Sequence, residues 1–305
     1  MGFADVFRIF YIQLILYGIF FPIFAYFLEE TREDVILRRR AQEARKAGQE
    51  IYALAELDKT PVHLRLARAA KRPAFLLFTE PVLAAATLLS AFSTGTVFLL
   101  TQSLAQVSNA LYGWSDYSSG YLLGAVSLGE FLGWFIAIYG TTLYFKSTRR
   151  NKETPGLPIP EARLYISIPA AFGGLVGGML MYGWLSYATI PWIGLAVGLC
   201  LLGAGITVIV STLADYIMDL YSPSSYAGSA ISAVAAGEQL VAGFLPFAAS
   251  SLYTNLGFHW ASTLLALVAA LLSLALVMLI WKGRTFREKS PFMLAGPAAK
   301  FYKLN

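Results

Sequence analysis

Two carboxyl groups inside long apolar stretches are the residues of this sequence best suited to chemistry. Glu130 lies near the middle of one such stretch and Glu238 near the middle of another, and neither stretch holds a Lys or Arg as a partner. A carboxylate in hydrocarbon costs about 2.5–3.5 kcal/mol unless it is paired, protonated or hydrated. Apolar surroundings favour the neutral form of a carboxyl group, so such a group can bind and release a proton as its surroundings open.

The pattern therefore predicts proton coupling or substrate contact at Glu238 and Glu130. The alternative for each is a protonated carboxyl group that hydrogen-bonds a neighbouring helix and only holds the packing together. The sequence leaves both interpretations open.

Further polar residues lie in or beside apolar stretches. Asp215 and Asp219 are four residues apart and so share one helix face, where pairing with loop arginines is the favoured interpretation; Asp215 is also a weaker candidate for proton coupling. Gln102 and Tyr216 could line a polar path through a membrane, or could simply pack between helices. We expect Glu80 to pair with the preceding Lys71 and Arg72.

Other site chemistries are not supported by the residues present. The sequence has two histidines, His63 and His259, and the single cysteine Cys200, which give neither a zinc site nor a Cys–His pair. No glycine-rich phosphate loop occurs. We therefore expect no metal, no cofactor and no enzymatic activity.

The elements that must position these residues are transmembrane helices. Hydrophobic residues make up 57% of the sequence and charged residues 13%, and the mean hydropathy is +0.61. A helix needs about 20 mostly apolar residues to cross about 30 Å of hydrocarbon. The expected fold is an all-α, polytopic transmembrane bundle of about seven segments: Ile9–Leu28, Pro81–Ala105, Tyr121–Phe145, Leu164–Tyr187, Ile190–Met218, Ala227–Tyr253 and Phe258–Ile280.

The basic residues divide unequally between the two sides of such a bundle. All of the 23 Lys and Arg residues except Arg8 fall on one side. Lys and Arg accumulate in short cytoplasmic loops, so the N-terminus is expected outside and the C-terminus in the cytoplasm. The positive charge thus marks membrane topology and does not indicate nucleic-acid binding.

The predicted domains are a single transmembrane helix (1–28), a cytoplasmic charged linker (29–72), a six-helix transmembrane bundle (73–281) and a cytoplasmic tail (282–305). Within the linker, Thr60-Pro61 predicts the start of a short basic helix that ends before Pro73. This helix could lie on the lipid headgroups or be a solvated connector. Small residues four apart, such as Gly129 and Gly133, favour close helix packing.

Several motifs resemble a known family. They are Glu30–Arg32 with Val35–Ala41, Pro160–Leu164, Tyr216–Tyr221, Asn255–Gly257 with Trp260–Ser262, Trp281–Arg284, and Arg287–Phe292. In order and spacing they resemble fungal major facilitator superfamily drug:proton antiporters of the twelve-span type, and the ending resembles the branch of cercosporin-type toxin exporters.

The resemblance implies that the first segment is the sixth helix of a twelve-helix transporter and that the rest is its C-terminal half. It implies proton-coupled efflux of small hydrophobic metabolites, toxins or drugs across the plasma membrane. Arg163, Asp219 and Glu161 are the candidates for cytoplasmic gating or charge pairing. Many multidrug relatives carry arginine where Glu238 stands, which is a departure. Two alternatives stay open: a half-transporter that works as an oligomer or beside a separate N-terminal half, and a non-transporting membrane regulator.

Overall fold

The computed structural model describes residues 3–30, 33–49, 51–52, 61–151, 156–222 and 226–293. Within these residues the chain is helical and has no strand, which confirms the expected all-α bundle. It divides into two compact units, Met1–Leu66 and Ala67–Asn305. The part of the predicted tail after residue 293 lies outside the described residues, as does Thr60 of the predicted helix start.

The first unit contains two helices of opposite character. Helix α1 (Phe3–Phe27) is apolar and long enough to cross a membrane, and the side chains of its most apolar window are all exposed. Helix α2 (Glu33–Lys46) is rich in charge, and the guanidinium of Arg45 in its last turn lies 4.8 Å from the ring centre of Tyr52. The predicted first segment thus matches α1.

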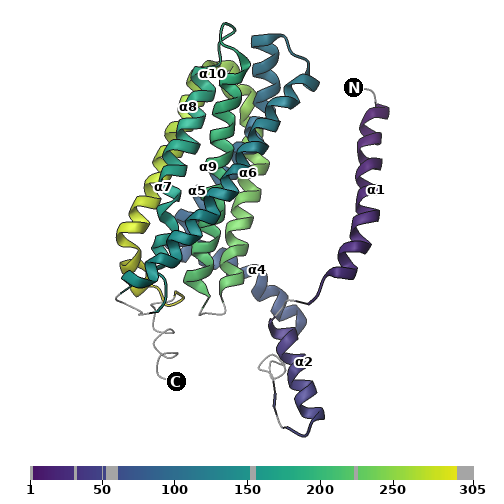
Figure 1. The fold of residues 1–305 in the computed structure, drawn as a ribbon, viewed down its shortest axis with the longest axis vertical. Helices are drawn as coiled ribbons and strands as arrows, with labels where there is room; N and C mark the ends of the chain where they lie inside the picture. The colour runs from purple at the N-terminus through teal and green to yellow at the C-terminus, as the bar shows by residue number, and fades with distance from the viewer. Residues whose placement is uncertain are drawn as a thin grey trace. The chain divides into compact units, whose positions relative to one another are not determined.

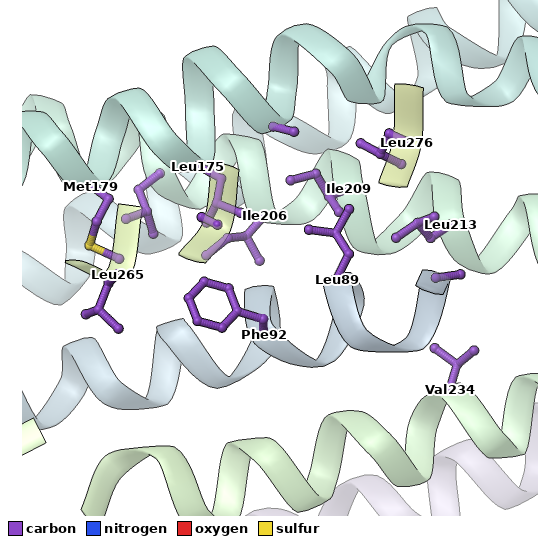
Figure 2. Close-up of a cluster of buried hydrophobic side chains, with 14 of the residues drawn as sticks. Leu89, Phe92, Leu175, Met179, Ile206, Ile209, Leu213, Val234, Leu265 and Leu276 are labelled. Atoms are coloured by element: carbon purple, nitrogen blue, oxygen red, sulfur yellow. The ribbon is translucent and has the colours of Figure 1, made fainter. Parts of the chain in front are cut away.

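The second unit is a bundle of long apolar helices that lie side by side (Figure 1). After α4 (Val62–Thr79) come α5 (Pro81–Tyr112), α6 (Asp116–Lys146), the short η1 (Ser147–Arg150), a composite segment from Pro160 to Trp184, α9 (Trp192–Tyr221) and α10 (Ala227–Lys289). Side chains from α5, α8, α9 and α10 meet in the buried core, among them Leu89, Met179, Ile209 and Leu265 (Figure 2).

Helix α10 is two segments joined at Gly257, whose backbone has φ 76° and ψ 164°. At a rise of 1.5 Å per residue, one continuous helix of this length would measure about 95 Å, three times the hydrocarbon thickness. The first segment lies along α5, because Glu238 contacts Ser90 and Thr254 contacts Gln106. The second segment runs back to the start of α5, since Ser290 contacts Glu80 just before that helix. In the part of the chain that the structure describes, six helices are long and apolar enough to cross a membrane, and α10 supplies two of the seven predicted segments.

The structure differs from the predicted helices at two prolines. The predicted segment Leu164–Tyr187 begins earlier and is irregular: 3₁₀ turn η2 (Pro160–Tyr165), α7 (Ser167–Pro169), π-helix η3 (Ala170–Val176) and α8 (Gly177–Trp184). Pro169 lacks a backbone donor, which disfavours a regular helix there. Helix α4 does not end before Pro73 but continues to Thr79, where burial of Leu76 offsets the lost hydrogen bond.

Close backbone contact holds α6 against α9. A Cβ atom added at Gly129 would overlap the backbone carbonyl of Cys200, and one added at Gly133 would lie 2.6 Å from the carbonyl oxygen of Ala204. Backbone atoms cannot rotate away as a side chain can. Gly124, on the same helix, has open space around it.

The substitution Gly129→Ala is therefore expected to lower the free energy of unfolding by about 1–3 kcal/mol, as overpacking does. The matched control is Gly124→Ala, which adds the same methyl group to the same helix and should cost nothing measurable. Thermal unfolding in detergent checks both, and equal midpoints for the two variants would contradict the close contact.

Candidate functional site

Arg163 is the centre of a charged cluster. The cluster lies at the end of the bundle where Glu80 and Arg287 also lie, and this end is called here the charged end. Nε of Arg163 lies 2.5 Å from Oδ2 of Asp219, and its Nη2 donates to Oδ1 of Asp219 at 3.3 Å. Its Nη1 donates to Oδ2 of Asp215 at 3.1 Å. The guanidinium also lies 3.9 Å from the ring centre of Tyr144. One arginine of η2 thus links the last turns of α6 and α9.

A second ion pair at this end is almost completely buried. Nη2 of Arg287 donates to Oε2 of Glu161 at 3.2 Å, and Nε of Arg287 lies 2.9 Å from Oε1 of Glu161. The two side chains are 5% and 7% exposed. Gly283 makes room for the pair, because a Cβ atom there would lie 2.5 Å from Oε1 of Glu161. The pair ties η2 to the last turns of α10.

Tyr216 lies on α9 within electrostatic reach of this ion pair and is fully buried. Its hydroxyl group has no hydrogen-bond partner among the described residues. The structure therefore places Tyr216 at the charged end and inside the packing, whereas Gln102 on α5 is exposed. The two residues proposed to line one path are at different depths in the protein.

Glu80, at the junction of α4 and α5, accepts a hydrogen bond at 2.9 Å from Oγ of Ser290, and both residues are buried. The expected ionic partner Arg72 lies instead over the ring of Tyr226, at 5.1 Å from its centre. Burial raises the pKa of the Glu80 carboxyl above its ordinary value, although hydrogen bonds from Ser290 and Tyr221 act in the opposite direction.

Glu238 and Glu130 lie on different helix pairs. Glu238 accepts a hydrogen bond from Oγ of the fully buried Ser90, so its carboxyl group joins the first segment of α10 to α5. Glu130 lies where α6 meets α9, and its backbone nitrogen is 3.2 Å from the position a Cβ atom would take at Gly203. Both carboxyl residues are half-buried.

Several partners in these contacts were not predicted. Ser90 and Tyr144 carried no signal in the sequence. Arg287 and Ser290 stood out only as members of the family motif Arg287–Phe292, which gave no contact partner for either. Glu161 and Arg287 are 126 positions apart, and Ser90 and Glu238 are 148 apart. A spacing rule reads only neighbours on one helix, so it could not have found these pairs.

Comparison with known proteins identifies relatives across most of the chain. It is 29% identical over 93% of its length to a protein named uncharacterized transporter mfc1 of Schizosaccharomyces pombe, and 29% identical over 91% to the major facilitator-type transporter sor6 of Hypocrea jecorina. It is 30% identical over 93% to the MFS-type efflux pump MFS2 of Trichophyton rubrum. The chain is a homologue of fungal major facilitator superfamily transporters.

The match covers 59%, 51% and 47% of these three relatives, so the chain spans about half the length of the major facilitator transporters it resembles. No family model and no solved structure matches it.

The buried pair of this major facilitator homologue predicts a stability difference. Arg287→Ala leaves Glu161 charged and buried, which is expected to cost about 3–5 kcal/mol. The control is Arg284→Ala on the same helix, because Arg284 pairs with Glu288 in an exposed i,i+4 contact (65% and 54% exposed) worth under about 1 kcal/mol. Chemical unfolding in detergent measures both, and equal losses would contradict the account.

Glu80 predicts a pH dependence. Because its pKa is raised in the folded protein, its contribution to stability is fully present below the ordinary pKa of 4.5 and is lost as the pH rises through the raised value. The stability of the native protein relative to Glu80→Gln should therefore fall as the pH rises. Ser290→Ala should move this fall to higher pH, because the lost hydrogen bond favours the ionised form. Parallel pH profiles for the native protein and Glu80→Gln would contradict the prediction.

Proposed function

We propose that this chain forms the C-terminal half of a membrane transporter that exports small hydrophobic metabolites, toxins or drugs in exchange for protons. The relatives are named as transporters and efflux pumps, which supports transport. The observation that carries proton exchange is the carboxyl group of Glu238 inside the bundle, hydrogen-bonded to Ser90 across two helices. Small-molecule substrates, protons and the lipid bilayer are the proposed partners.

The Ser90–Glu238 contact depends on whether Glu238 carries a proton. An ionised carboxylate can only accept hydrogen bonds, whereas a protonated one can also donate. Binding or losing a proton therefore changes the contact between α5 and α10, the two helices that Glu238 joins. A coupling group needs this property, because its protonation must alter how helices pack. Glu130 is the second coupling candidate, and it acts on the contact between α6 and α9.

At the charged end, ion pairs join neighbouring elements. Arg163 bridges three elements through Asp215, Asp219 and Tyr144, with pairs that are partly exposed to solvent. We propose that Arg163 and Asp219 close the cytoplasmic side in one state of the transport cycle. The buried Glu161–Arg287 pair stays formed throughout, because separating it would leave two desolvated charges. Asp215 is assigned to this cluster in preference to the proton path.

Alternating access in this superfamily uses two six-helix halves around a midplane site. We propose that the second half comes from a preceding segment of the same polypeptide. The alternatives are a second copy of the chain, a separate polypeptide, and a role as a non-transporting regulator. The excess of Lys and Arg on one side of the predicted topology supports a cytoplasmic C-terminus and an outside N-terminus. The plasma-membrane address is proposed from the family resemblance.

The first test separates these alternatives. The chain alone and the chain fused to the N-terminal half of a relative are produced in membranes, and efflux of a fluorescent hydrophobic compound is measured. Efflux by the fusion alone supports the proposal. Efflux by the chain alone together with an inter-copy crosslink favours the homo-oligomer, and inactivity of both contradicts transport.

The second test concerns the proton. In vesicles with an imposed pH gradient, Glu238→Gln is expected to reduce gradient-driven efflux by about 10-fold or more, which is within the range for loss of a proton-transfer group. Exchange without a gradient should persist, because the substrate path is intact. Glu288→Gln, an exposed carboxylate on the same helix, is the matched control. Full gradient-driven efflux in a Glu238→Gln, Glu130→Gln double variant would remove both residues from the coupling path.

A further inference from the structure

Among the described residues, helix α4 contacts the bundle through one face. Leu76 is fully buried, and the ring of Phe75 packs edge-on against Phe292 with 6.2 Å between centres. Phe292 in turn packs against Tyr226 at 4.9 Å, and the guanidinium of Arg72 lies over the same Tyr226 ring. These contacts fix the rotation of α4 about its own axis.

The opposite face of α4 is exposed. Ala67, Lys71, Ala74 and Phe78 follow one another at helical spacings of three and four, and all four are exposed. Phe78 is 88% exposed, which makes it one of the most exposed large apolar side chains in the described part of the chain. Arg68 lies beside this stripe and is exposed as well.

The position of this face along the membrane normal follows from connectivity. Helix α4 ends at Thr79, and α5 begins its crossing at Pro81 with only Glu80 between them. The exposed Phe78 is therefore within one helical turn of the start of a transmembrane segment. A phenyl ring at this level is stable in the layer between headgroups and acyl chains, where the amphipathic helices of membrane-surface proteins lie.

We propose that the exposed face of α4 lies in the headgroup layer of the membrane that the bundle spans and binds anionic lipid through Arg68 and Lys71. The range from Pro61 to Thr79 contains no Asp or Glu, so the charge of this face is complementary to an anionic surface. The stripe presents one large apolar side chain, Phe78, with two alanines and Lys71. That suits shallow insertion between lipids better than a protein interface, whose core needs clustered anchors.

The test places a spin label on this face in the full chain. Cys200 is the single cysteine, so Cys200→Ser gives a parent for Phe78→Cys labelled with a nitroxide. The protein is placed in lipid nanodiscs of phosphatidylcholine, with and without phosphatidylserine. Accessibility of the label to oxygen and to a water-soluble nickel complex is then measured. We expect the label to be reached by oxygen and shielded from nickel, more strongly when phosphatidylserine is present.

We next neutralise both basic residues (Arg68→Gln with Lys71→Gln). In phosphatidylserine discs this should reduce the ratio of label in the lipid layer to label in water by about 10-fold or more. Each basic residue near such a surface raises the affinity for it about fivefold. In phosphatidylcholine alone the same change should have little effect. The matched control is Arg39→Gln with Arg40→Gln on α2, which removes the same charge elsewhere and should leave the label unchanged.

Three outcomes would overturn the proposal. A label reached freely by nickel in both lipids places the face in water. A label shielded from both reagents places it against protein, such as a second copy of the chain. An equal response to the charge change in both lipids shows that anionic headgroups are not what this face binds.

Discussion

A charged side chain inside an apolar bundle is stable only where a partner, a proton or water offsets its desolvation. The described part of this chain meets the requirement in two ways. At the charged end, guanidinium groups pair with carboxylates, in the buried contact of Glu161 with Arg287 and the more open contact of Arg163 with Asp219. Within the bundle, Glu238 has a serine hydroxyl group as its partner and forms no ion pair with a described residue. Pairing fixes the first set of groups, and the proposal is that a proton changes the second.

The two ion pairs differ in burial, and this difference favours different roles for them. Separating Glu161 from Arg287 would expose two desolvated charges, so this pair holds η2 and the end of α10 together. The Arg163 cluster reaches solvent through Asp215, so water could replace part of its stabilisation if these residues separated. The proposed transport cycle requires both kinds of contact, because some helices must move while each half stays intact.

Much of the fold could be predicted from hydropathy, since each apolar segment from α1 to the second half of α10 has a counterpart in the sequence. Helix continuity was harder to predict, because Pro73 and Pro169 both disfavour a regular helix. Helix α4 nevertheless continues past Pro73, where Leu76 is buried, whereas the segment around Pro169 is irregular. The partners of Glu238, Glu161 and Glu80 could not be predicted at all. They depend on how each helix is rotated about its axis, and helices that are apolar on every side leave that rotation unspecified.

The central claim is that a carboxyl group inside the bundle exchanges a proton, and infrared spectroscopy of the membrane-embedded chain tests it most directly. A protonated carboxyl group in apolar surroundings has its own carbonyl stretching band, separate from that of a carboxylate. The account predicts such a band, lost reversibly as the pH is raised and reduced in Glu238→Gln. A band that persists at every pH would show that the carboxyl group only packs between helices, and one unaffected by Glu238→Gln would remove Glu238 from the proposed proton exchange.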